Sequence, residues 1–473
     1  MNNKKIVKKR VVSNDQVASN SIVKLPNSLI WLFAILLLGA VPFEGFVVYQ
    51  AGDYSLSVPL VVVILVLLWM IPITLLRGRI ILDRVSLAAF GLTICGFSSG
   101  IGVIVQSLEA RAYFESLSLT LIWPMVFILF SQRKFSEKEL AKFLWFTLCI
   151  GTGVAIVGIY QVVSNNLVPG LPRLIFNLTN PITGPQRQWT FGAAGKYLRP
   201  TSFFAEPSWF AHFLVPIILL GSMLLTRTRR RMLVMTLLLI NFFAFVAAFS
   251  LGAYIAMLGT FGVVSLFTDK ARRWCFAGGI VTIILLSVAY FLSPPLIHQL
   301  LNELITRWYI DVRKGIESFV TSNNAYFLES SGSLRLGTAR LGINLWLRTP
   351  MTFLFGWGVG EFGNAAQIIG MPPVAFSGTG WTSVLAEQGI IGFFAYSCFL
   401  GRFLKSIKTS SEISVTRRPQ RKRARVDSVI MKLLAVFLIF SGFTGGLGFE
   451  RSLRFWIVTT SVNVVRRSVA PTR

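Results

Sequence analysis

Apolar runs long enough to cross a lipid bilayer recur along the chain from Leu29 onward, separated by short polar stretches. A hydrocarbon core about 30 Å thick is spanned by roughly 20 residues of α-helix, because each residue advances the helix by about 1.5 Å. Backbone groups that meet no water must bond to one another, which such helices achieve. The sequence therefore predicts an all-α polytopic membrane protein with about twelve transmembrane helices.

The positions of the predicted spans follow from the apolar runs and their flanks. We expect spans over residues 29–49, 58–76, 85–105, 113–130, 143–163, 207–225, 274–292, 384–404, 433–449 and 453–465, with two short helices in 232–267. The stretch 232–267 is divided because it is too long for one span and carries Ser250, Leu251 and Gly252 at its middle.

Lys and Arg are concentrated in alternate connections, and this alternation predicts the orientation of the spans. Segments 77–84, 133–142, 227–231, 270–273 and 417–425 are basic, whereas the loop around Asp53 and the turn at Ser250 carry no Lys or Arg. Basic connections remain on the cytoplasmic side, so we expect both termini to be cytoplasmic. The Lys and Arg residues that give the net charge of +27 lie mostly in these connections, where they can contact anionic lipid headgroups. We therefore expect membrane lipid as a partner, and not nucleic acid.

The same map divides the chain into segments on defined sides of the membrane. We expect a basic cytoplasmic tail (1–28), spans one to five (29–163), an extracytoplasmic loop (164–206) and spans six to nine (207–292). A large extracytoplasmic loop (293–383), span ten (384–404), a basic cytoplasmic loop (405–432) and spans eleven and twelve with the tail (433–473) complete it. Long structureless loops are uncommon, and helical runs at 296–319 and 334–347 predict a small cap on the outer face.

Few residues are available for metal or nucleotide chemistry. The two histidines are His212 and His298, the four cysteines lie within apolar runs, and no glycine-rich loop is followed by Lys-Ser or Lys-Thr. Metal centres need clustered ligands, and nucleotide-driven engines need a phosphate loop. We therefore expect no metal and no cofactor.

The most informative polar segment leads into predicted span six. Pro207 suits the first turn of a helix, whose free N–H donors attract anions. Arg199 lies a few residues upstream, and its guanidinium can bind a phosphate through two N–H groups. Glu206, directly before the expected helix start, can accept a proton from a hydroxyl. Ser208 and His212 are four residues apart and share one helix face. A capped helix with an interfacial Arg–Glu pair and a buried histidine is the structural alternative.

A second polar segment lies in the larger outer loop. Arg335 and Arg340 are five residues apart, so at most one is expected to face a site. Three glycines at alternate positions, from 356 to 360, allow close backbone approach or positive φ angles. A solvated helix followed by a turn is the alternative. At the start of span ten, Glu387 is expected in the first helical turn, where it complements the helix dipole, so a structural role is favoured.

Three blocks occur in an order that resembles the O-antigen ligase and polymerase superfamily, specifically its Wzy-like exopolysaccharide polymerases. The blocks are 199–211, the Ser-Leu-Arg segment leading to Pro350 and Phe-Gly-Trp-Gly-Val-Gly, and Glu-Gln-Gly-Ile-Ile-Gly from Glu387. The resemblance covers most of residues 140–405. Ligases typically show a His-Asn-like pair before the third block, where this chain has Gly-Thr-Gly-Trp-Thr-Ser at 378–383. That departure favours a polymerase.

The resemblance implies a metal-independent membrane glycosyltransferase at the outer face of the bacterial plasma (inner) membrane. Its members move a glycan from undecaprenyl diphosphate to an acceptor hydroxyl, with flippase and chain-length regulator proteins as partners. Arg199 and Arg335 would then stabilise the diphosphate leaving group. Glu206 would be the base for the acceptor hydroxyl, with His212 a weaker candidate. The candidate substrate-binding residues are Arg340, Ser208, Gly356, Gly358, Gly360 and Glu361.

Other activities stay open. Ligase-type transfer to another acceptor would use the same lipid-linked donor. A transporter or flippase of lipid-linked sugar is expected to show internal repeats or broken helices at mid-membrane, and the sequence has no convincing half-to-half repeat. A glycosyltransferase that uses a polyprenyl-phosphate sugar is expected to carry acidic residues in the first outer loop, where Asp53 stands alone.

Overall fold

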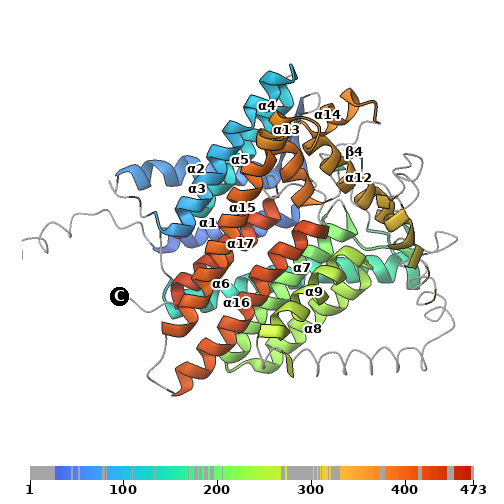
Figure 1. Cartoon of the computed structure of the whole chain (residues 1–473). Helices are drawn as coiled ribbons and strands as arrows, with labels where there is room; N and C mark the ends of the chain where they lie inside the picture. The colour runs from blue at the N-terminus through green and yellow to red at the C-terminus, as the bar shows by residue number, and fades with distance from the viewer. Residues whose placement is uncertain are drawn as a thin grey trace, which may run out of the picture.

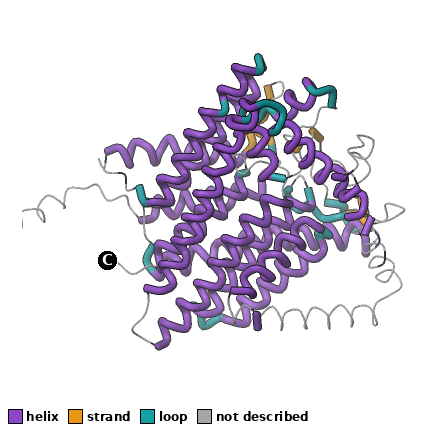
Figure 2. The backbone as a smooth tube through the Cα atoms, in the orientation of Figure 1, coloured by secondary structure: helices purple, strands orange, loops and turns teal. Residues whose placement is uncertain are grey.

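The chain folds into a bundle of helices, most of them long (Figures 1 and 2). The computed structural model describes residues 27–43, 46–51, 54–76, 80, 82–108, 110–132, 135–168, 170–174, 179–180, 184–185, 190–191, 197–204, 206–267, 272–273, 302, 306, 309–310, 312–317, 319–320, 331–371, 379–413, 418–444 and 452–469. Strands in this part of the chain form three antiparallel pairs, so the fold is mostly but not purely α.

Six helices in the described part of the chain are long and apolar enough to cross a membrane. They are α2 (Val58–Leu76), α3 (Arg84–Ser98) continued by α4 (Gly100–Val105), α5 (Ala110–Ser131), α6 (Glu137–Val162) continued by the π turn η3 (Val163–Leu167), α7 (Pro207–Ser222) continued by η4 (Met223–Thr226), and α15 (Gly380–Ile413). These helices support a multi-pass membrane protein.

Helices that are shorter or more polar than these six complete the bundle. They are α1 (Asn27–Ala40), α8 (Arg231–Ala247), α9 (Leu251–Phe267), α12 (Ser331–Trp346), α13 (Pro350–Phe355), α14 (Phe362–Ile368), α16 (Arg418–Thr444) and α17 (Leu453–Val469). The division of 232–267 into two helices is confirmed by the turn between α8 and α9. The predicted span 274–292 lies outside the described residues, so the number of twelve spans stays a prediction.

The first predicted span is shorter than expected. The helix gives way to a 3-10 turn, η2 (Val41–Phe43), and then to β1 (Val47–Ala51), which pairs with β2 (Tyr54–Ser57). The prediction of helix through residue 49 is therefore wrong. β-Branched and aromatic residues favour a strand, and Gly-Asp at positions 52 and 53 is a typical hairpin-turn sequence. The remaining strands, β3 (Thr179–Asn180), β4 (Gly184–Pro185), β5 (Thr190–Phe191) and β6 (Tyr197–Leu198), lie in the predicted loop 164–206.

Two other boundaries also differ from the prediction. Helix α15 continues to Ile413 and α16 begins at Arg418, so most of the predicted basic loop 405–432 is helical. The reason is that Lys, Arg and Gln are good helix formers and extend a helix beyond its apolar part.

Glycines bring α6 and α7 into close contact. A Cβ on Gly158 would lie 2.5 Å from Cζ of Phe210, and a Cβ on Gly151 would lie 2.2 Å from Cγ2 of Ile217. Small residues at such positions let helices approach closely in a membrane protein. The packing therefore fixes α7 against α6 at both of these levels.

Connections predicted to be cytoplasmic meet at one end of the bundle. Arg227, which follows η4, donates through Nη1 to Oδ1 of Asp427 on α16 at 2.6 Å, and Nη2 bonds to Oδ2. Both side chains are 2% exposed, and Glu137 at the start of α6 lies 3.8 Å from Nε of Arg227. This buried, bidentate pair joins three connections that the charge pattern places on the same side.

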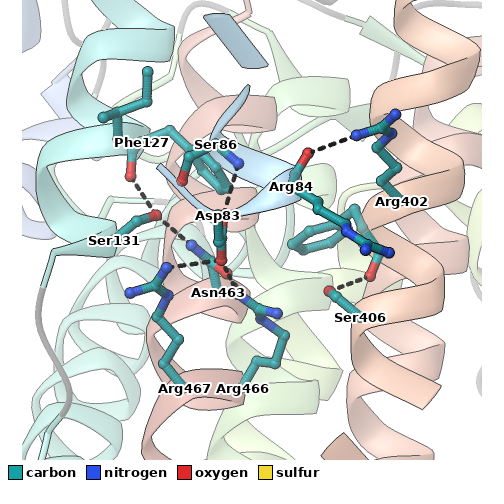
Figure 3. A network of polar contacts seen from close by, with 12 residues as sticks. Asp83, Arg84, Ser86, Phe127, Ser131, Arg402, Ser406, Asn463, Arg466 and Arg467 are labelled. Carbon is teal, nitrogen blue, oxygen red and sulfur yellow. Dashed lines mark hydrogen bonds and ion pairs between the residues drawn. The ribbon is translucent and has the colours of Figure 1, made fainter. Parts of the chain in front are cut away.

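A second polar network lies among other connections predicted on that side (Figure 3). Asp83 caps α3 by accepting from the Ser86 N–H at 2.8 Å, and its Oδ2 accepts from Arg466 at 3.0 Å and from Arg467 at 2.7 Å. Burial acts to raise the pKa of the Asp83 carboxyl, but the hydrogen bonds from Ser86 and Arg467 and the Arg467 charge outweigh it and hold that pKa well below its usual range. Arg402 of α15 donates to the Arg84 carbonyl at 3.4 Å, which adds α15 to the network.

Candidate functional site

The segment between β6 and α7 is anchored at the start of α7. Pro207 occupies the first turn of the helix, as the sequence predicts, and Glu206 is the N-cap with extended backbone angles (φ −137°, ψ 144°). Phe204 is fully buried, and its ring centroid lies 6.2 Å from that of Phe210 and 5.2 Å from that of Phe213. The buried Phe204 therefore fixes the position of Glu206 at the start of α7.

Two amide side chains at the end of α6 hold the same segment. Gln161 Oε1 accepts from the backbone N–H groups of Thr201 (3.0 Å) and Ser202 (2.7 Å), and its Nε2 donates to the carbonyls of Leu174 (3.0 Å) and Ser202 (3.3 Å). Asn166 forms a similar pair with the backbone of Leu198, at 2.7 and 3.0 Å. The sequence analysis missed both residues, although amides at the end of an apolar run were a usable signal.

Arg199 lies against the turn between α8 and α9. It is partly buried, and its Nε donates to the carbonyl oxygen of Ala248 at 3.1 Å. The contact therefore positions the guanidinium at the α8–α9 turn, which the charge pattern places on the outer side.

Strained backbone flanks this contact. Ser202, three residues after Arg199, has a φ of 51°, and Phe249, next to Ala248, has a φ of 45°. A positive φ is costly for a side chain other than glycine and persists only where the surroundings enforce it. In the described part of the chain, Ser107 is the other non-glycine residue with a positive φ. Such strain is more frequent at functional sites than elsewhere, which favours this mouth as a site.

Three of the predicted site residues form one hydrogen-bonded chain at the start of α7. Ser208 Oγ donates to Oε2 of Glu206 at 3.0 Å, and His212 Nδ1 lies 2.7 Å from the Ser208 carbonyl oxygen. Since a carbonyl only accepts, Nδ1 is the donor, so in the neutral ring the lone pair is on Nε2. All three side chains are partly exposed. The structure therefore brings together Glu206, Ser208 and His212, with Arg199 upstream; we call these four residues the α7 mouth.

The predicted residues of the larger loop form a second group, built on α15. The predicted helix 334–347 is confirmed by α12, which packs against α15. Arg335 is partly buried on α12, while Arg340 donates through Nη1 to the carbonyl oxygen of Phe319 at 2.5 Å. This contact ties α12 to a preceding part of the loop and gives Arg340 a structural partner.

The three candidate glycines pack backbone against backbone. Gly356, Gly358 and Gly360 have φ angles of 76°, 110° and 87°, as their spacing predicts. The N–H of Gly358 donates to the Glu387 carbonyl at 2.9 Å, and a Cβ on Gly356 would lie 2.3 Å from the carbonyl carbon of Glu387. Gly356 lies against α15 and against Gly102 of α4, and Gly360 lies against α5, where an added Cβ would be 2.7 Å from the Ala112 carbonyl oxygen. A role in binding substrate therefore stays a prediction. Figure 1 shows α4 and α13 together at the top of the view.

Two acidic residues near these glycines are fully buried. Glu361 accepts from Nδ2 of Asn364 at 2.7 Å beneath the glycine turn. Glu387 lies just before Gly389, where α15 leaves helical geometry (φ 66°, ψ −165°). Because α15 begins at Gly380, Glu387 lies about two turns into the helix, and the placement in its first turn was wrong. Glu387 is therefore too far from the helix start to be explained by interaction with the helix dipole, which was the reason for favouring a structural role.

Comparison with known proteins adds no assignment. Neither a protein-family model nor a curated protein matches the chain. Within the described ranges, no three His, Cys, Asp or Glu side chains gather where they could hold a metal ion. The α7 mouth, in which Glu206, Ser208 and His212 are linked at one helix start and Arg199 lies upstream in the chain against the α8–α9 turn, is the candidate functional site.

Proposed function

We propose that the chain is a membrane glycosyltransferase that polymerises undecaprenyl-diphosphate-linked oligosaccharide repeat units at the outer face of a bacterial plasma membrane. One observation carries the proposal: Arg199 is held, partly buried, upstream of Glu206 at the start of an apolar helix. A lipid-linked donor keeps its tail in the bilayer and its diphosphate at the surface, where a cation at a helix start can meet it.

The chemistry of the transfer fits the α7 mouth. The bond between the anomeric carbon of the donor sugar and its phosphate oxygen breaks, and the acceptor hydroxyl oxygen forms the new bond to that carbon. Arg199 stabilises the negative charge on the departing lipid diphosphate. In other enzymes, removal of one such preorganised donor slows the reaction by about 10²- to 10³-fold. Glu206 takes the proton of the acceptor hydroxyl. Arg335 is the second candidate cation for the diphosphate.

The break in α15 at Gly389 is a feature that favours the transporter alternative. Transporters use interrupted helices whose exposed backbone groups bind substrate or ions. Here the carbonyls of Ala386 and Glu387 at the break accept from the N–H groups of Trp357 (2.8 Å) and Gly358 (2.9 Å). Because the protein's own loop satisfies these groups, the break supports packing of α13 against α15 better than it supports a transport site.

The proposal is tested with purified protein and lipid-linked repeat units. We expect a ladder of products from the wild type, none from Arg199→Ala, and a normal ladder from Arg111→Ala. Arg111 is a matched control because it is an exposed cation at the start of α5, paired with Glu115 at 3.1 Å and remote from the α7 mouth in sequence. Long polymer from Arg199→Ala would refute the proposal. A single transfer without a ladder would indicate a ligase, and movement of intact lipid-linked sugar across vesicles would indicate a flippase.

A further inference from the structure

The Gln161 side chain uses all of its hydrogen-bonding groups on the Arg199 segment and the neighbouring loop. A primary amide has two N–H donors and one oxygen with two lone pairs. Gln161 directs both lone pairs to the N–H groups of Thr201 and Ser202 and both donors to the carbonyls of Leu174 and Ser202. The side chain is 4% exposed, so these bonds have little competition from water.

Two of the Gln161 hydrogen bonds fix the backbone of Ser202 on both sides of its Cα. Ser202, with its positive φ, receives a bond at its N–H and another at its carbonyl from the same Gln161 amide, and its Oγ donates to the Val154 carbonyl of α6 at 2.8 Å. A strained backbone needs such fixing to stay populated. Ser202 lies between Arg199 and Glu206, so its conformation sets the direction in which the chain leaves Arg199 toward the start of α7.

We propose that Gln161 is the positioning residue of the α7 mouth: it holds the Arg199 segment in the conformation in which Arg199 binds a lipid diphosphate. The choice of ligand rests on the proposed function, whereas the positioning itself rests on the contacts above. Gln161 acts through Arg199 and touches no reacting atom. Without it, the Ser202 turn relaxes and Arg199 samples directions in which its guanidinium no longer faces the diphosphate.

The experiment measures local order and ligand binding in the full-length protein in detergent. The variants are Gln161→Met, which has similar size and loses all four bonds, Gln161→Glu, which keeps the acceptor for Thr201 and Ser202, and Arg199→Ala with and without Gln161→Met. The matched control is Tyr160→Phe, which removes the neighbouring hydrogen bond from Tyr160 to the Pro172 carbonyl (2.9 Å) and leaves the Arg199 segment intact. The ligand probe is undecaprenyl diphosphate, with undecaprenol as the probe that lacks the anion.

Hydrogen exchange should show faster exchange at the amides of Thr201 and Ser202 in Gln161→Met, by about fivefold or more, since each amide loses one buried hydrogen bond. Tyr160→Phe should match the wild type, and Gln161→Glu should lie between. Affinity for the diphosphate should fall about tenfold in Gln161→Met, with no change for undecaprenol. The double variant should bind no more weakly than Arg199→Ala alone, because the two residues act through one contact.

Unchanged exchange in Gln161→Met would overturn the inference, and so would additive losses in the double variant or a wild type that binds no diphosphate. Different results would contradict the proposed polymerase function. Binding that depends on both Gln161 and Arg199, without any polymer, would remove the polymerase and keep the positioning role. Polymer formation at the wild-type rate by Gln161→Met, with Arg199→Ala inactive, would remove the positioning role and keep the polymerase.

Discussion

Arg467, in the last turn of α17, donates through Nη2 to Oδ2 of Asp83 at 2.7 Å, and Asp83 is the N-cap of α3. The contact joins residues 384 positions apart in the chain. One carboxylate thus serves two purposes: one oxygen caps a helix, and the other binds two arginines from the helix that ends the described chain. A cation at the C-terminal end of α17 is also favoured by the helix dipole.

Substitution of Asp83 should separate these two purposes. Asn caps helices about as well as Asp, so Asp83→Asn should keep the cap and lose the charge, whereas Asp83→Ala loses both. We expect both variants to unfold at lower temperature than the wild type, with Asp83→Ala less stable than Asp83→Asn by about 1 kcal/mol. Thermal unfolding in detergent measures this, with Arg84→Ala, an exposed neighbouring cation, as the control. Equal stability of the two Asp83 variants would show that the cap contributes nothing.

Acid should weaken the same contact. The pKa of the folded Asp83 carboxyl is lowered, so its contribution to stability is complete above the unfolded pKa of about 3.9 and is lost as the pH falls from there toward the folded pKa. The stability difference between wild type and Asp83→Asn should therefore be constant from neutral pH to about pH 5 and shrink below it. Unfolding measured across that range tests the sign, and a difference that grows on acidification would contradict it.

Local signals were sufficient for much of the fold, because they depend on neighbouring residues alone. Pro207 at a helix start and the turn near Ser250 were predicted correctly, and Gly356 has the positive φ that its glycine identity allowed. Sequence-distant contacts could not be predicted. The partner of Arg199 is a backbone carbonyl at Ala248, and a carbonyl carries no residue signature. Likewise, the amide of Gln161 was a usable local signal, but its partners at residues 201 and 202 depend on how the chain returns to α6, which no local pattern encodes.

The buried pair of Arg227 and Asp427 should be sensitive to loss of either partner. Removal of one member leaves the other charge buried, which costs about 3–5 kcal/mol in comparable pairs. We expect Arg227→Met and Asp427→Asn each to lower stability or yield strongly, and the double variant to lose less than the sum of the two. The control is Arg229→Ala, an exposed cation two residues away. Additive losses would mean that the two side chains do not depend on each other.

Two glycines with positive φ differ in how closely other atoms approach them. Gly356 and Gly370 have nearly the same φ, 76° and 77°, but a Cβ on Gly356 would lie 2.3 Å from the Glu387 carbonyl carbon, whereas one on Gly370 would meet nothing within 4 Å. Gly370→Ala should therefore cost about 1–2 kcal/mol, the usual penalty of a side chain at positive φ.

Gly356→Ala carries a larger backbone penalty, because φ 76° with ψ −167° lies in a region that essentially only glycine occupies. The added Cβ must also push α13 away from α15. We expect it to cost several kcal/mol, above about 4, or to prevent folding, because the three nearest atoms all belong to the backbone of Glu387 and Gln388. Unfolding temperature and folded yield in detergent measure both variants side by side. Equal effects of the two substitutions would show that the loop does not press against α15 as closely as the structure has it. A larger effect at Gly356 would instead show that close packing of α13 against α15 contributes to stability.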